Sequence, residues 1–138
     1  MLKKVIALLL TCVTIGSTAI PICAANLQYA SPYYLYTIDA SSTLIISENT
    51  ASCESYLTGY RGTTTKVAAT QYLEKKSGMT WKKVSGGTWS DTQNGSTFSL
   101  YNSKSNLESG TYHVRTVFTV YSGTKSETVE KTSKEVTI

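Results

Sequence analysis

The sequence predicts an all-β protein, and three observations support this prediction. Thr, Val and Tyr, which favour the pleated and half-buried positions of strands, are frequent, and tyrosine alone occurs 10 times. No alanine- or leucine-rich stretch with helical character follows the N-terminal segment. Strand-like runs recur along the chain with turn signals between them, which is the pattern of a β-sandwich.

The first 25 residues have the features of a signal peptide. Lys3 and Lys4 form a short basic region, an apolar run follows over residues 5–15, and Pro21 interrupts any helix. Small side chains before the expected cleavage point predict a cut after Ala25. We therefore expect a secreted, extracellular protein.

Two other interpretations of this segment fit less well. A membrane span needs about 20 apolar residues, and polar residues interrupt this run. A lipoprotein would carry a small residue before the lipidated cysteine, whereas Thr11 precedes Cys12. After cleavage, the sequence predicts no stable membrane anchor.

Removal of 25 of the 138 residues leaves 113, which is enough for one domain with a modest core. The tyrosine-rich residues 26–42 include Pro32 and are expected to form an extended N-terminal arm. Residues 43–138 are expected to form the sandwich domain.

Seven strand candidates follow one another in this domain. Residues 85–96, "SGGTWSDTQNGS", have the glycines and the Asn-Gly pair of a loop. The number and spacing of the strands fit a single immunoglobulin or fibronectin III-like β-sandwich, although a small open barrel would have a similar pattern. The candidates are residues 43–47, 51–60, 65–76, 79–84, 96–102, 110–122 and the segment from 125 to 138.

Cysteine usage agrees with a domain that is not held by disulfides. Cys12 and Cys23 lie within the predicted signal peptide, so Cys53 remains alone in the mature chain and no intrachain disulfide is possible. We expect Cys53 to be a reduced and buried core residue, because free cysteine behaves as a small hydrophobe. A mixed or intermolecular disulfide is the alternative.

The segment "LESGTYHV", residues 107–114, resembles the tyrosine corner of immunoglobulin-like sandwiches. The resemblance implies that Gly110 permits a tight turn and that the Tyr112 hydroxyl bonds to the upstream backbone. It also implies that Leu107 closes the end of the sandwich and that Cys53 faces Val114 across the core.

The runs "YLEKKSGMTWKKV" and "LESGTYHVRTVFTVYSG" resemble a family of small secreted proteins of Gram-positive bacteria that carry an uncharacterised domain. The resemblance extends over Thr43 to Ile138. It implies a sandwich fold and an extracellular location, and it implies no activity.

Charge and motifs argue against nucleic-acid binding and catalysis. Loss of Lys3 and Lys4 leaves 11 basic residues against 9 acidic ones, and the lysines look scattered along the sequence. His113 is the only histidine and is expected to face solvent, and no nucleophile motif, metal-ligand spacing or phosphate loop is present. We therefore predict a protein that is not an enzyme and that needs no cofactor or metal.

Aromatic residues are the remaining candidates for ligand contact. Trp89, Trp81, Tyr33 and Tyr34 could form such a surface, although large aromatics are more often structural in small domains. The predicted function is that of a secreted, non-catalytic module that binds an unknown extracellular protein or glycan. The alternative is a structural module that self-associates through edge strands or through the tyrosine-rich arm.

Overall fold

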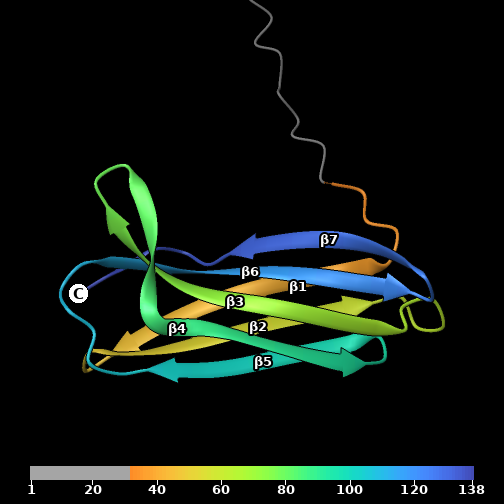
Figure 1. Ribbon diagram of the computed structural model, residues 1–138, viewed down its shortest axis with the longest axis horizontal. Helices are drawn as coiled ribbons and strands as arrows, with labels where there is room; N and C mark the ends of the chain where they lie inside the picture. Colours follow the sequence, from red (N-terminus) through yellow and green to blue (C-terminus); the bar gives the residue numbers. More distant parts are fainter. Residues whose placement is uncertain (1–31) are drawn as a thin grey trace, which may run out of the picture. The chain divides into compact units, whose positions relative to one another are not determined.

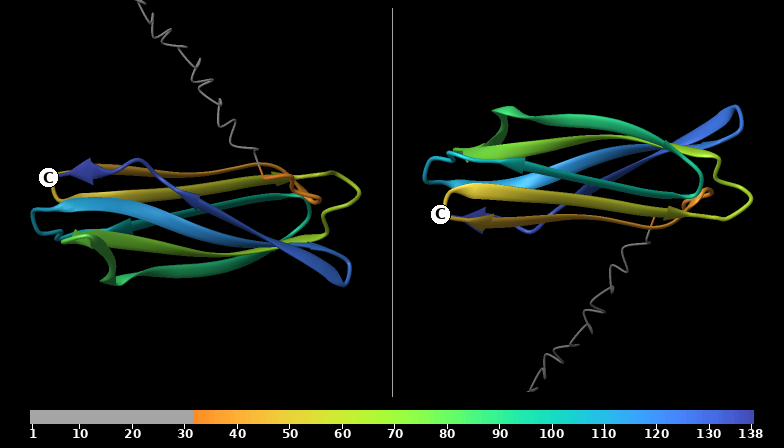
Figure 2. Two further views of the ribbon diagram at one scale, coloured as in Figure 1. Left: turned by 90° about the horizontal axis from the view of Figure 1, so that it is seen from above. Right: turned by 90° about the horizontal axis from the view of Figure 1, so that it is seen from below.

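Eight antiparallel strands form two facing sheets in the computed structural model, which describes residues 32–138 (Figure 1). The first sheet has the order β1-β2-β5, and the second has the order β4-β3-β6-β7, with the short β8 also paired to β6. Figure 2 shows the two layers from the side. The strands are β1 (Thr37–Ser47), β2 (Thr50–Gly59), β3 (Lys66–Ser77), β4 (Thr80–Asn94), β5 (Thr97–Lys104), β6 (Thr111–Ser122), β7 (Lys125–Thr132) and β8 (Val136–Thr137).

This arrangement is an immunoglobulin-like β-sandwich, as the sequence predicted. In the lettering of immunoglobulin domains, β1, β2 and β5 take the places of strands A, B and E. Strands β4, β3, β6 and β7 take the places of C′, C, F and G. Within residues 32–138 there is no helix of the length and apolarity needed to cross a membrane.

Alternating side chains build the core, because successive residues of a strand point to opposite faces of its sheet. In β2 the buried positions run from Ala51 to Gly59 at every second residue, and in β6 they run from Tyr112 to Val120 in the same way. Phe98 and Phe118 meet edge to face near the middle of one cluster, with ring centroids 6.0 Å apart. A second cluster surrounds Cys53 and lies toward the tyrosine corner.

A layer of buried polar side chains separates the two apolar clusters. Ser55 of the first sheet bonds to Thr116 of the second at 2.7 Å, and the Gln71 amide donates to the Ser55 hydroxyl at 2.7 Å. Ser42 donates to Thr116, and Asn102 donates to the Gln71 carbonyl. No buried side-chain polar atom among the described residues lacks a partner, so this layer joins the sheets without an unsatisfied group.

The structure corrects three predicted boundaries. Strand β1 begins at Thr37, so residues 37–42 of the predicted arm belong to the sandwich. The predicted loop over residues 85–96 is wrong, because β4 continues to Asn94. The C-terminal segment forms two strands, β7 and β8, so there are eight strands where the sequence predicted about seven. The predicted signal peptide and residues 26–31 lie outside the described residues.

Candidate functional site: a lysine-lined pocket

The hairpin between β3 and β4 brings four lysines together. Lys75 and Lys76 precede the turn, and Lys82 and Lys83 follow it. Gly78 adopts a left-handed conformation (φ 63°) in this turn, which a residue without a Cβ adopts readily. The strand register then places Lys75 directly opposite Lys82.

A bulge of four residues in β4 turns this hairpin tip away from the sheet. Tyr72 pairs with Thr88 and Glu74 pairs with Lys83, so the four residues from Val84 to Gly87 lie opposite Leu73 alone. A Cβ on Gly87 would lie 3.0 Å from the Leu73 Cβ, so the bulge passes close to the core strand only because this residue is glycine. Figure 1 shows the tip of the hairpin standing away from the body of the sandwich.

A pocket of about 500 Å³ lies between the hairpin and the segment that joins β5 to β6. Five lysines contribute to its lining, against one glutamate. Neutral hydrogen-bonding groups and a few apolar side chains complete it. The lining residues are Lys75, Lys76, Ser77, Lys82, Lys83, Val84, Ser85, Lys104, Asn106, Leu107, Glu108 and Tyr112.

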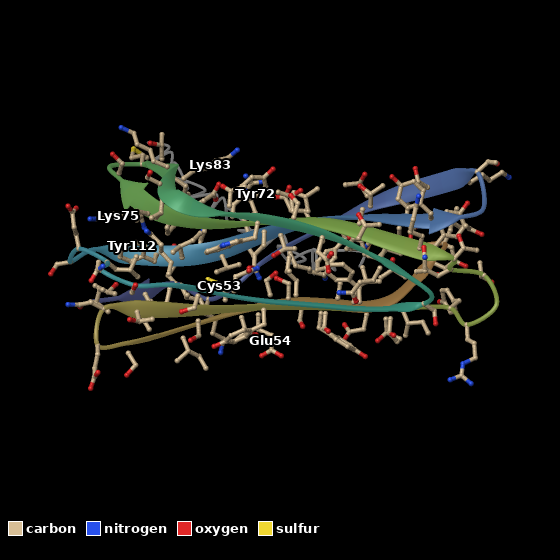
Figure 3. The ribbon with its side chains drawn as sticks, turned by 60° about the horizontal axis from the view of Figure 1, so that its bottom comes forward. Cys53, Glu54, Tyr72, Lys75, Lys83 and Tyr112 are labelled. Carbon is tan, nitrogen blue, oxygen red and sulfur yellow. The ribbon has the colours of Figure 1, made fainter. Side chains whose placement is uncertain are left out.

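Three of the lysines have partners nearby. Lys75 bonds to Glu108 at 3.2 Å, and this hydrogen bond is the main reason why the pKa of Lys75 is raised. The Lys76 ammonium lies 3.5 Å from Glu135. Lys83 places its ammonium over the ring of Tyr72, 4.2 Å from the ring centroid, on the outer face of the second sheet, and Figure 3 shows both side chains.

Lys82 and Lys104 have no ion-pair partner in the part of the chain that the structure describes. Lys104 reaches across from the end of β5 toward the bulge. Its ammonium lies 3.5 Å from the place where a Cβ would stand on Gly86, so the missing side chain leaves room for it. The pocket therefore contains ammonium groups that are available to an anion.

The tyrosine corner forms the opposite wall. The Tyr112 hydroxyl donates to the Glu108 carbonyl at 2.6 Å, and Leu107 is buried in the core cluster that also contains Cys53 and Val114. A Cβ on Gly110 would lie 2.5 Å from Cε of Lys75. The glycine therefore lets the Lys75 side chain cross the corner and reach Glu108. Figure 3 shows Lys75 and Tyr112 at this end of the sandwich.

A buried ionic cluster holds the base of the hairpin on the outer face of the second sheet. Glu74 bonds to His113 at 2.8 Å and to Arg115 at 2.9 Å. Burial raises the pKa of Glu74, but the hydrogen bonds and charges of Arg115 and His113 outweigh burial, and the pKa is lowered overall. The indole of Trp81 stacks on the His113 ring and covers the cluster.

The predicted exposure of His113 is therefore wrong. His113 does point outward from β6, but the hairpin folds over it and leaves it buried. The predicted alternation along β6 was correct. The sequence of β6 alone could not show that Trp81 of β4 covers His113.

The four predicted ligand-contact aromatics do not form one surface. Trp81 is half-buried on His113, and Trp89 is half-buried against the core cluster around Cys53. Tyr33 is 88% exposed, whereas Tyr34 packs against the other core cluster. The register places the arm at the opposite end of the sandwich from the β3–β4 turn, since Thr37 pairs with Gly59.

Sequence reasoning missed the lysine pocket, although one signal pointed to it. The string "KKSGMTWKK" carries one lysine pair on each side of a turn, and the hairpin register makes Lys75 and Lys82 direct neighbours across the strands. Lysines that look scattered in the sequence are clustered in the fold. No local sequence pattern indicates that Lys104 lines the pocket, because its position there depends on how β5 packs against β4.

Cys53 is a free and buried thiol among the described residues. Burial raises its pKa to about 12, so at neutral pH it is the protonated, unreactive form.

The fold and the corner define the class of this protein as a small immunoglobulin-like β-sandwich domain. No protein-family model matches the sequence, and a comparison with curated proteins finds no relative. Two solved structures are similar at low identity. The solution structure of CsgH from R. palustris is 8% identical with a TM-score of 0.42, over 68% of this chain and 88% of CsgH. The CARDB domain of the PF1109 protein from Pyrococcus furiosus, solved with di-metal ions, is 13% identical with a TM-score of 0.43, over 78% and 93% of the two chains.

Proposed function

We propose that the protein is a secreted, non-catalytic module that binds an acidic ligand, carried by an extracellular protein or glycan, in the lysine-lined pocket. The observation that carries this proposal is the cross-strand pair of Lys75 and Lys82. Like charges directly opposite each other destabilise a strand pair. Glu108 offsets this repulsion at Lys75, and an anion that binds beside Lys82 would offset the rest.

The size and charge of the pocket support the proposal. Its volume of about 500 Å³ is in the range of pockets that hold small ligands, roughly 300–1,000 Å³. The surplus of lysine over glutamate attracts acidic groups and speeds their encounter with the site.

The other parts of the proposal rest on the sequence and on the surroundings of His113. Residues 1–25 have the features of a signal peptide, and the chain resembles secreted proteins of Gram-positive bacteria. His113 is engaged by Glu74 and Trp81 in holding the hairpin. This engagement favours a structural role for the histidine over a role as a general base.

Binding to immobilised acidic polymers tests the proposal. A sulfated polysaccharide and poly-glutamate are suitable probes, and we expect retention that weakens with added salt because screening reduces the attraction of exposed charges. The double variant Lys82→Glu/Lys104→Glu should lose retention, since it reverses the two pocket lysines whose ammonium groups have neither an ion-pair partner nor an aromatic ring beside them among the described residues.

The matched control is Arg61→Glu/Lys125→Glu. It changes the net charge by the same amount at two exposed positions at the other end of the sandwich, in the β2–β3 connection and at the first residue of β7. The control should keep retention. Equal loss in both double variants would show that total charge and not the pocket governs binding, and absence of binding by the unmodified protein would refute the proposal.

Secretion has its own test. Expression of the full chain in a Gram-positive host should release a protein into the medium whose N-terminal sequence begins at Asn26. Retention in the cells with an intact N-terminus would contradict this part of the proposal and would leave the pocket unaffected.

A second candidate function is self-association through β1. This strand lies at the edge of its sheet, and residues 40–47 contain no charged side chain, which is the composition that edge strands usually avoid. Sedimentation of the protein at increasing concentration tests this function, with Ile45→Lys as the variant because Ile45 is exposed on the outer face. A monomer at all concentrations would exclude it.

A further inference from the structure

We infer that the lysine-lined pocket selects a phosphate monoester attached to a sugar. This inference rests on the proposed function and names the ligand class for the same site. Three features of the pocket point to it: the charge in a small volume, the type of basic side chain, and the apolar surface beside the charges.

The charge density favours an anion with more than one negative charge. Lys75 and Lys76 form ion pairs with Glu108 and Glu135, and the Lys83 ammonium lies over the Tyr72 ring. Lys82 and Lys104 therefore leave two positive charges in the pocket without a partner among the described residues. A single carboxylate from a ligand would compensate only one of these two charges. A phosphate monoester carries about −1.5 to −2 charges at neutral pH.

The donor type favours a tetrahedral anion over a carboxylate. Arginine presents a planar fork that matches the two oxygens of a carboxylate, whereas lysine acts as a point charge and suits phosphate without a fixed plane. The basic residues that line the pocket are all lysines, and they approach from β3, β4 and β5. Lys75, Lys82 and Lys104 could each address a different phosphate oxygen.

The rest of the lining fits a sugar that carries the phosphate. Half-buried Val84 provides apolar surface, and the almost fully buried Leu107 and Tyr112 add only their edges. Ser85 and Asn106 provide neutral hydrogen-bonding groups beside them. A sugar ring has an apolar face and a rim of hydroxyl groups, so it can use both kinds of surface at once. A bare inorganic anion would use only the lysines.

Isothermal titration calorimetry with four small probes tests the inference. Glucose 6-phosphate is compared with glucose 6-sulfate, glucuronate and O-phosphoserine. We expect glucose 6-phosphate to bind at least about tenfold more tightly than each of the others, a difference that calorimetry resolves. The sulfate and glucuronate probes vary the charge and shape of the anion, and phosphoserine varies the carrier.

Two variants assign the binding to the pocket. Lys82→Gln should weaken the affinity for glucose 6-phosphate by about tenfold or more, as expected when a charge-assisted hydrogen bond is lost. Lys125→Gln, at the opposite end of the sandwich, should leave the affinity unchanged. Both variants should melt at the same temperature as the parent, because they change exposed side chains.

The outcomes separate this inference from the proposed function. If the acidic polymers bind but glucuronate, sulfate and phosphate probes bind equally, the ligand class is wrong and the proposed function stands. Tighter binding of phosphoserine than of glucose 6-phosphate would overturn the inference that a sugar carries the phosphate, and it would indicate a phosphorylated protein as the ligand. If neither polymers nor small probes bind, both proposals fail.

Discussion

Trp81 stacks on His113 with their ring centroids 3.6 Å apart and an angle of 20° between the planes. Trp81 comes from the hairpin tip and His113 from strand β6, so this contact joins the end of a long hairpin to the sheet beneath it. The lysines on either side of Trp81 line the pocket, and their placement depends on this contact.

Removal of the indole should therefore loosen the tip without unfolding the sandwich. Trp81→Ala is expected to lower the free energy of unfolding by about 1–2 kcal/mol, because an aromatic stack and its buried area are lost. Urea denaturation measures this change, and amide hydrogen exchange should quicken between Lys76 and Lys83. Met79→Ala is the control, since Met79 is 100% exposed at the same tip. Equal exchange in the two variants would contradict the role of the stack.

Glu74 should make the stability of the protein depend on pH in the acidic range. Its folded pKa lies below the ordinary value of 4.5, so the folded state releases this proton more readily than the unfolded state does. The resulting stabilisation is fully present above pH 4.5 and is lost as the pH falls toward the folded pKa.

Glu74→Gln tests this dependence. At neutral pH the variant should be less stable by about 3 kcal/mol, because Arg115 and His113 lose a buried carboxylate. Below pH 4.5 the difference from the parent should shrink. Urea denaturation at several pH values measures both effects, with the exposed Glu54→Gln as control. A difference that stayed constant with pH would be inconsistent with an ionised Glu74.

Cys53 should react with thiol reagents only when the protein unfolds. Its side chain is 0% exposed and burial raises its pKa to about 12, so neither access nor thiolate is available in the folded state. A bulky disulfide reagent should label the protein quickly in urea and hardly at all in buffer. Rapid labelling without denaturant would mean that the second core cluster opens readily.

The polar layer should be cooperative. Gln71→Ala leaves Ser55 and Asn102 without their amide partner and is expected to cost about 2 kcal/mol, the typical effect of an unsatisfied buried group. Ser55→Ala and the double variant complete a thermodynamic cycle. Because the residues share one network, the double variant should cost less than the two single variants added together. Strict additivity would argue against a joined network.

The strands of the core were predictable because their signals are local. The alternation in β2 and β6, the turn glycines and the corner pattern all depend on residues close in sequence, and the structure places Tyr112, Leu107 and Cys53 in one cluster. The predicted loop at residues 85–96 failed for a physical reason. Gly86 and Gly87 do interrupt the regular pairing, but as a bulge inside one long strand and not as a break between two strands.

The candidate site was less predictable, because it depends on pairs of distant residues. Trp89 lies in a glycine-rich and polar segment that was predicted to be a loop. Its position against the core follows from the register that places it opposite the buried Gln71. Lys75 and Lys104 are 29 residues apart in sequence and line the same pocket only after β5 packs beside the hairpin. Local patterns do not contain this information.

The bulge at Val84 to Gly87 divides β4 into two parts with different structural roles. The part from Thr88 onward completes the sandwich, whereas the part before the bulge belongs to the hairpin tip and shares few of its contacts with the core. Substitutions or length changes in the tip can therefore accumulate while the sandwich stays intact, provided that Trp81 keeps its place on His113. The architecture separates the evolution of ligand preference from the maintenance of the fold, and it makes the tip a natural position for grafting new recognition sequences.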